Sequence, residues 1–257
     1  MKRLITFVLT VVNMVCAFGF LTEKEKAVLG GDGTTVLDLR NRYITPEDVK
    51  AIANGLRENK TLEMLVLDHN TRSHKGEIGP KGAVVLAEAL KENTALCELS
   101  LAYNVIGAEG AAALAEALEV NETLWKLNLY WNSIGDEGAK ALAAVLETNS
   151  TLAELNLVGN WVGDEGAEAL AETLKINSTL FRLGLGGGKI GDAGAKALAE
   201  ALKVNSTLHE LDLGYNEISD EGAKALEEAV MENSTLIKLD LGFNHINPEV
   251  KKELLGK

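Results

Sequence analysis

Residues 149–176 read NSTLAELNLVGNWVGDEGAEALAETLKI, and this stretch contains one complete structural unit. Leu155 and Leu157 alternate with polar residues, which is typical of a short β-strand with one buried face. From Ala167 onward, alanine and leucine recur at helical spacing, so that they form one apolar stripe. The stretch therefore predicts one strand followed by one helix.

The turn between this strand and this helix carries residues with separate tasks. The side-chain amide of Asn160 is suited to satisfying the backbone of the turn, so that stacked copies would form an asparagine ladder. Gly163 and Gly166 permit a tight entry and close packing. Asp164 and Glu165 fall where the helix begins, and we expect their charges to match its positive end.

The same unit recurs along the chain with a period of 28 residues. Leucines open the copies at Leu96, Leu124, Leu152, Leu180, Leu208 and Leu236. An irregular first unit contains Leu37, one period before Leu65, and an insertion of about six residues lies near 71–76.

The stacking of such units determines the expected architecture. Neighbouring strands lie about 4.8 Å apart whereas packed helices need about 8 to 10 Å, so the array must bend with its helices outside. We therefore predict an α/β fold, a solenoid that forms a right-handed βα horseshoe of about eight 28-residue repeats. A parallel sheet lines its concave face.

The two ends of the chain differ from the repeats. Residues 1–19 combine basic residues, an apolar run and a small-residue cleavage pattern, which predicts a signal peptide and a secreted or cell-surface protein. The alternative is a buried capping helix, and with it a cytoplasmic protein. Residues 20–33 are predicted as an N-terminal cap, residues 34–246 as the repeats, and residues 247–257 as a C-terminal capping helix.

The composition limits the possible partners. The formal net charge is -13, with 38 acidic residues against 25 Lys and Arg. Nucleic acid and anionic membrane surfaces would be repelled, so we expect neither, whereas a protein with a basic surface is a possible partner. The two cysteines are too few for a disulfide framework. We expect no membrane span after signal removal, and a monomer when the chain is alone.

The unit that begins at Asn205 carries a resemblance to a known family. Its pattern through Leu211, Leu213 and Asn216 is similar to leucine-rich repeats of the ribonuclease-inhibitor type, especially the repeat domains of NOD-like receptors. The resemblance covers about residues 34–257. It implies non-catalytic recognition of a protein through the concave face and its rim. The same repeat class implies an alternative, a regulator of a small GTPase of the Ran GTPase-activating type.

The predicted binding surface consists of the variable positions between the strand leucines and of the rim beyond them. Tyrosine and tryptophan are favoured anchors at interfaces. The predicted partner-binding residues are Tyr103, Lys126, Asn128, Tyr130, Trp131, Glu154, Asn156, Trp161, Arg182, Glu210, Asp212, Tyr215 and Phe243. Four of these aromatics, from three successive repeats, could gather into one patch: Tyr103, Tyr130, Trp131 and Trp161. The alternative is that they cover the solenoid edge or pack on one another.

Asparagines of the repeat also form N-glycosylation sequons. The candidates are Asn59, Asn121, Asn149, Asn177, Asn205 and Asn233, each two residues before a threonine. Five of them share one position of the repeat, where asparagine suits the helix end, so their presence does not prove export.

Motifs that would indicate chemistry are weak in this sequence. Residues 186–191 match GxGxxG, but Gly188 replaces the repeat asparagine and Gly191 is the ordinary turn glycine, so we expect no dinucleotide and no other cofactor. Asp68, His69 and His74 lack the compact spacing of a metal site, and we expect no metal. No catalytic constellation is present in the sequence, so we expect no enzyme.

Overall fold

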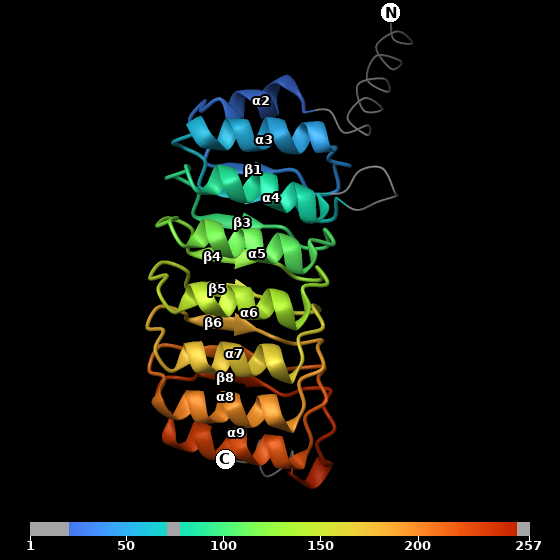
Figure 1. Cartoon of the computed structure of the whole chain (residues 1–257), viewed down its shortest axis with the longest axis vertical. Helices are drawn as coiled ribbons and strands as arrows, with labels where there is room; N and C mark the ends of the chain where they lie inside the picture. The colour runs from blue at the N-terminus through green and yellow to red at the C-terminus, as the bar shows by residue number, and fades with distance from the viewer. Residues whose placement is uncertain (1–20, 71–77, 251–257) are drawn as a thin grey trace, which may run out of the picture.

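The computed structural model describes residues 21–70 and 78–250, which form two stacked layers (Figure 1). One layer is a sheet of the strands β1 (Val36–Asp38), β2 (Met64–Val66), β3 (Glu98–Ser100), β4 (Lys126–Asn128), β5 (Glu154–Asn156), β6 (Arg182–Gly184), β7 (Glu210–Asp212) and β8 (Lys238–Asp240). The other layer contains the helices α2 (Glu23–Leu29), α3 (Pro46–Glu58), α4 (Gly79–Leu90), α5 (Gly107–Leu118), α6 (Gly135–Leu146), α7 (Asp164–Leu174), α8 (Asp192–Val204) and α9 (Asp220–Glu232). Strands and helices therefore alternate, as predicted.

The sheet is parallel throughout, and its strands follow one another in chain order. Its register places the middle leucine of each strand opposite the middle leucine of the next strand. We call these residues the central leucines: Leu37, Leu65, Leu99, Leu127, Leu155, Leu183, Leu211 and Leu239. The pairing continues from β2 to β3 although extra residues separate these strands in the sequence, so the insertion leaves the register intact. The predicted α/β solenoid of about eight repeats is confirmed.

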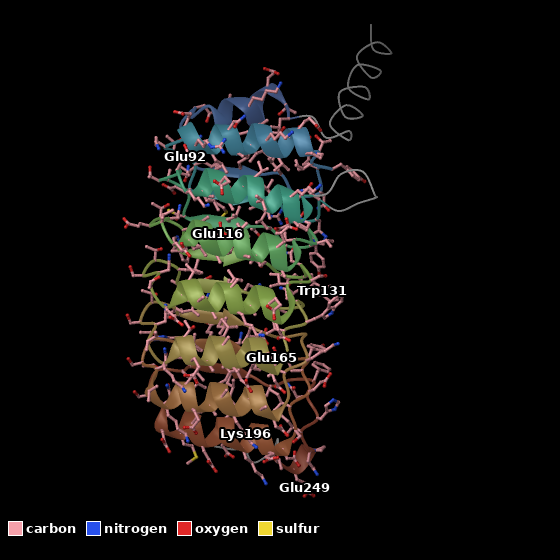
Figure 2. The ribbon with its side chains drawn as sticks, viewed as in Figure 1. Glu92, Glu116, Trp131, Glu165, Lys196 and Glu249 are labelled. Carbon is pink, nitrogen blue, oxygen red and sulfur yellow. The ribbon has the colours of Figure 1, made fainter. Side chains whose placement is uncertain are left out.

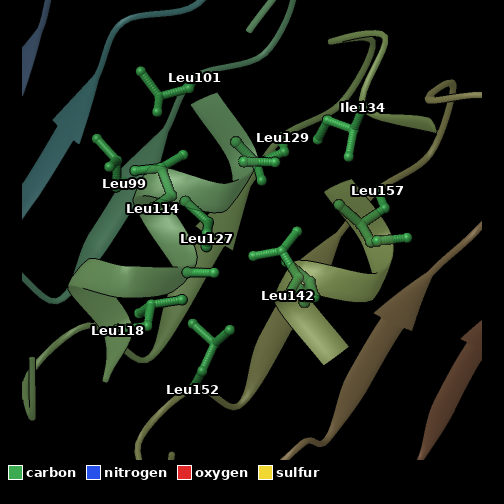
Figure 3. Packing of buried hydrophobic residues seen from close by; sticks show 14 of the residues in the cluster. Leu99, Leu101, Leu114, Leu118, Leu127, Leu129, Ile134, Leu142, Leu152 and Leu157 are labelled. Carbon is green, nitrogen blue, oxygen red and sulfur yellow. The ribbon is translucent and has the colours of Figure 1, made fainter. Parts of the chain in front are cut away.

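The core lies between the two layers and consists of small aliphatic side chains. Leu127 and Leu129 point inward from one strand region, and Leu114 and Leu142 meet them from the neighbouring helices (Figure 3). Close approach of the helices requires glycine in the first turn of α5 to α9. A Cβ on Gly166, for example, would lie 3.0 Å from that of Ala139, which confirms the predicted close packing.

Asparagines that follow strands β2 to β5, β7 and β8 form the predicted ladder. Asn160 is fully buried, and its Oδ1 accepts the amide of Asn132 at 2.8 Å and that of Ile134 at 3.3 Å. Its Nδ2 donates to the carbonyl oxygens of Leu129 and Leu157 at 2.7 and 2.9 Å. Because each asparagine bonds two repeats, the ladder fixes their stacking, and it is interrupted where Gly188 replaces asparagine.

A second ladder, of aspartates, lies at the helix starts. Helix α7 begins at Asp164, but the carboxylate of Asp164 accepts the amides of Gly191 and Gly194 in the next repeat, both at 2.8 Å. The expectation that Asp164 acts on its own helix is therefore incomplete, because its hydrogen bonds go to the start of α8. Asp192 continues the ladder by accepting the amides of Ser219 and Gly222 at 2.8 and 3.0 Å.

Acid is expected to weaken this aspartate ladder. Burial would raise the pKa of Asp192, but hydrogen bonds from the Ser219 hydroxyl and amide and from the Gly222 amide outweigh burial and hold that pKa below its ordinary value. A carboxylate with a lowered pKa stabilises the fold above its unfolded pKa, near 4, and this stabilisation is lost as the pH falls through the folded pKa. Asp192→Asn should therefore cost about 1 kcal/mol at neutral pH and progressively less below about pH 4.

Urea unfolding followed by circular dichroism at several pH values measures this difference. The matched control is Glu200→Gln, which removes a carboxylate from an exposed ion pair with Lys203 and should change stability little. If the loss in the free energy of unfolding caused by Asp192→Asn stays constant between pH 3 and pH 7, the prediction is contradicted. The loss would then not come from hydrogen bonds to a charged carboxylate.

Helix α2 precedes the first strand and contributes Val28 and Leu29 to the core. Thr22 and Glu25 form a capping box at the start of α2, and Glu25 also pairs with Arg42. At the other end, the predicted helix begins at Pro248, while the predicted remainder of that helix and the predicted signal peptide lie outside the described residues. The predicted insertion near 71–76 also lies outside the described residues. Across the described ranges, no helix has the length and hydropathy that a membrane span needs.

Candidate binding surface

The open face of the sheet carries a row of alternating charges. The row, which we call the charge ladder, occupies the position before the central leucine in strands β3 to β8. It consists of Glu98, Lys126, Glu154, Arg182, Glu210 and Lys238. Lys126 Nζ lies 3.5 Å from Glu98 and 3.3 Å from Glu154, and Arg182 lies 3.1 Å from Glu154 and 3.0 Å from Glu210. The predicted residues of this row are thus brought together, mostly paired with one another.

The position after each central leucine forms a second row, which changes along the sheet. Asn128 donates through Nδ2 to the Ser100 hydroxyl at 2.9 Å, so this part of the row is neutral. Asp212 and Asp240 follow at the other end of the sheet, and in the described part of the chain neither carboxylate forms an ion pair. A groove of about 290 Å³ runs over strands β4 to β8 between the two rows. On β7 and β8 the two rows carry three carboxylates, those of Glu210, Asp212 and Asp240, and one cation, Lys238, so this end of the groove is negative.

A row of eight positions, five of them occupied by a residue with a ring, borders the sheet where the strands lead into the helices. We call the residues four positions after each central leucine the ring row: Asn41, His69, Tyr103, Trp131, Gly159, Gly187, Tyr215 and Phe243. All of them have left-handed backbone conformations, with φ between 52° and 75°. Such conformations are uncommon for bulky residues and are found where the surroundings over-determine them, often at functional sites.

Neighbouring rings of this row contact one another. His69 stacks on Tyr103 with ring centroids 3.9 Å apart, and Tyr103 lies parallel to Trp131 at 5.9 Å. Tyr215 stacks on Phe243 at 4.2 Å. Figure 2 shows Trp131 at the edge of the solenoid, on the side opposite Glu92 at the end of α4. The rings therefore both pack on one another and reach the surface.

The predicted aromatic patch is gathered only in part. Tyr130 joins the ring row through edge contacts with Tyr103 at 5.1 Å and with Trp131 at 6.3 Å. Trp161 is 59% exposed, but it makes no ring contact with these three within the described residues. His69 was missed as a member of the patch, although its register with Tyr103 could have indicated it. Whether these residues bind a partner stays a prediction.

Comparisons with known proteins agree with this architecture. A family model described as the TMOD/LMOD Leucine-rich domain matches residues 76–187, and a second model, Leucine Rich repeat, matches residues 177–199, 204–226 and 232–249. The chain is built of leucine-rich repeats. The finer resemblance to the ribonuclease-inhibitor type and to NOD-like receptors is not confirmed by these matches, and they do not support the Ran GTPase-activating alternative.

Two solved structures are similar to part of the chain. "Leiomodin-1 Actin-Binding Site 2 (ABS2)" is 22% identical with a TM-score of 0.41, and the alignment covers 46% of this chain and 69% of that one. The tropomodulin C-terminal domain of Caenorhabditis elegans is 18% identical with a TM-score of 0.48, over 61% of this chain and 93% of that one. No curated protein matches the chain.

The sequon asparagines have a structural role in these leucine-rich repeats. Each Nδ2 donates to a backbone carbonyl of the preceding unit at 2.6 to 2.8 Å, in Asn59, Asn121, Asn149, Asn177, Asn205 and Asn233. Their Oδ1 atoms accept the amides that lead into the next strand, as in Leu124 on Asn121 at 2.8 Å. A glycan on Nδ2 would displace these bonds in the folded chain, so the repeat itself accounts for the asparagines.

The GxGxxG motif and the candidate metal ligands have structural explanations in the described residues. Gly188 lies against the next asparagine of the ladder, because a Cβ added to it would come within 2.8 Å of Asn216 Oδ1. Asp68 accepts the Ser100 hydroxyl at 2.6 Å and His69 stacks on Tyr103, while His74 lies outside the described residues. No group of His, Cys, Asp and Glu in the described ranges could hold a metal ion. Burial raises the pKa of the Cys97 thiol, which disfavours the nucleophilic thiolate.

Proposed function

We propose that the chain is a non-catalytic recognition module that binds another protein through the charge ladder and the ring row. The observation that carries this proposal is the exposure of large rings held in left-handed conformations at one edge of the sheet. Trp131 is 51% exposed, Tyr215 62% and Phe243 72%. Exposed aromatic side chains with a fixed backbone lose little entropy on binding, which favours them as anchors.

The ion pairs within the charge ladder can be replaced by ion pairs with a bound protein. Its ion pairs are partly exposed, and such pairs contribute about 0 to 1 kcal/mol each, so their replacement by charges of a bound protein costs little. Asp212 and Asp240 are without such a partner in the described residues, and the whole chain has a formal charge of -13. We therefore infer a partner that brings a basic segment to the end of the groove at β7 and β8.

Charge reversal on the sheet face tests the proposed surface. The variant Lys126→Glu with Arg182→Glu makes the charge ladder uniformly negative over five successive strands. For a protein captured by the wild type, we expect binding to weaken at least about tenfold. Carboxylates of that protein that replace Glu154 beside Lys126 and Arg182 would then face anions, whereas Asp212 and Asp240, which attract its basic segment, are unchanged. A tenfold change requires only 1.4 kcal/mol, and two charges are reversed. Calorimetry with the purified partner measures the change.

The matched control reverses two cations on the helical side. Lys140→Glu with Lys196→Glu gives the same net charge, and both lysines form exposed ion pairs with the next repeat. Binding should survive in this control. Equal loss in both variants would overturn the proposed surface, and greater loss in the control would assign the surface to the helices. Circular dichroism of each variant, together with Lys126→Gln and Arg182→Gln, separates lost binding from lost folding.

A further inference from the structure

The backbone of the ring row is continuous across all its repeats. The amide of Trp131 donates to the carbonyl oxygen of Val158 at 2.9 Å, and the next three members of the row make the same bond one repeat later. For Gly159, Gly187 and Tyr215 the distances are 2.7, 2.8 and 2.7 Å. The glycines therefore occupy the same place as the aromatic residues, with the same left-handed conformation.

The row of rings, in contrast, is interrupted. The indole of Trp131 covers Gly159, because a Cβ added to Gly159 would collide with that ring. Nothing comparable covers Gly187, where an added Cβ would meet only the backbone of Gly159 at 3.2 Å. Tyr215 follows directly and stacks on Phe243. One stacking place is thus vacant, above Gly187, between the ring of Trp131 and the ring of Tyr215.

The dimensions of this vacancy suit one planar group. Adjacent repeats are about 4.8 Å apart at the sheet, so the three steps from Trp131 to Tyr215 span roughly 14 Å. The Trp131 ring fills the first of these steps, over Gly159. Stacked pairs elsewhere in the row have ring centroids 3.9 and 4.2 Å apart. A planar group inserted between two rings would need about this distance to each ring.

Carboxylates beside the vacancy select the charge of that group. A Cβ added to Gly186, the neighbour of Gly187, would lie 2.9 Å from Asp212 Oδ1. Asp240 follows on the next strand, and a Cβ on Gly214 would lie between the two carboxylates, at 3.3 and 3.6 Å. Asp212 accepts a hydrogen bond from the amide of Gly214 at 2.9 Å, and Asp240 accepts one from the amide of Gly242 at 2.8 Å. Neither carboxylate is neutralised by an ion pair in the described residues. A cation is therefore favoured here.

We propose that the vacancy above Gly187 receives an arginine side chain of the protein partner, stacked between Trp131 and Tyr215 with its guanidinium toward Asp212. Arginine is the side chain that is planar, always charged and able to bind a carboxylate through two N–H groups while its face lies on a ring. Lysine lacks the plane, and an aromatic side chain lacks the charge. This inference rests on the proposed function and names the chemistry that its surface recognises.

Matched peptides test the chemistry. The probes are a short peptide of glycine, serine and arginine, the same peptide with lysine, and the same peptide with citrulline, which keeps the plane and loses the charge. Binding is followed by nuclear magnetic resonance of the Trp131 indole N–H. We expect the arginine peptide to bind about tenfold more tightly than either analogue. Equal binding of the arginine and lysine peptides would overturn the proposal, because charge alone would then explain it.

Variants of the protein locate the site. Gly187→Tyr fills the vacancy with a ring, and the fold should tolerate it because Tyr103 and Tyr215 occupy the same position with φ of 56°. Binding of the arginine peptide should fall about tenfold in Gly187→Tyr and in Asp212→Asn. The control is Lys189→Gln, which removes the exposed cation two residues from Gly187 and should not weaken binding. If Gly187→Tyr does not fold, Tyr215→Ala removes one wall of the same site.

The outcomes for the natural partner separate this inference from the proposed function. Loss of the partner in Lys126→Glu with Arg182→Glu, together with unchanged binding in Gly187→Tyr and Tyr215→Ala, would leave the recognition surface in place and overturn the arginine site. Unchanged binding in all of these variants would overturn both.

Discussion

Replacement of Asn160 by alanine is expected to lower the free energy of unfolding by about 3 kcal/mol. Its side chain is fully buried and bonds two backbone amides and two carbonyl oxygens at 3.3 Å or less. Alanine would leave those buried groups unpaired, and each unsatisfied group costs about 1 to 3 kcal/mol before the structure relaxes. Urea unfolding followed by circular dichroism measures the loss.

The interrupted position of the same ladder gives an informative comparison. Gly188→Asn restores the repeat asparagine, and repeat similarity alone would predict a more stable protein. We expect it to be less stable by about 1 to 3 kcal/mol, because a Cβ at this position would collide with the carbonyl oxygen of Val162 and crowd Asn216. A stable Gly188→Asn protein would show that the backbone here can move to accept a side chain. A stable Asn160→Ala protein would contradict the role of the ladder.

The fold could be predicted because every repeat states the same pattern. Leucines at two-residue spacing predict a strand, and alanines at helical spacing predict a helix. The period of 28 residues then predicts that equivalent strands and helices stack in register. The hydrogen-bond partners of individual side chains were harder to predict. Asp164 was expected to serve its own helix, whereas it binds the next one, because that contact depends on the separation of neighbouring helices.

The candidate site was predicted in its residues and not in its geometry. The alternation of Glu98, Lys126 and Glu154 is visible in the sequence, but their pairing follows only from the parallel register that places them side by side. Likewise, the exposed rings were expected at the rim, while the left-handed conformation and the vacancy at Gly187 depend on backbone torsions that the sequence does not state. Ring stacking also depends on which way each side chain leans, so the sequence could not show that Trp161, among the described residues, makes no ring contact with Trp131.

Leu155→Ala is expected to have the other large effect, a loss of about 2 to 5 kcal/mol in the free energy of unfolding. Leu155 lies in the central part of the sheet, is 1% exposed, and pairs in register with Leu127 and Leu183. Truncation would remove a buried isobutyl group and leave a cavity between two close-packed layers. In a repeat array each unit is stabilised mainly by its neighbours, so this cavity weakens two interfaces at once.

Leu239→Ala provides the matched control, because the same truncation occurs in the last strand. Leu239 has the same place in its repeat, but it is only partly buried and has a neighbouring strand on one side among the described residues. We therefore expect about half the loss or less, since the apolar area removed from water is smaller and one interface is affected instead of two. Urea unfolding of both variants, with hydrogen exchange read repeat by repeat, measures the difference. Equal losses would mean that the array unfolds as one cooperative unit whose stability does not depend on where a repeat lies, and would contradict the nearest-neighbour account.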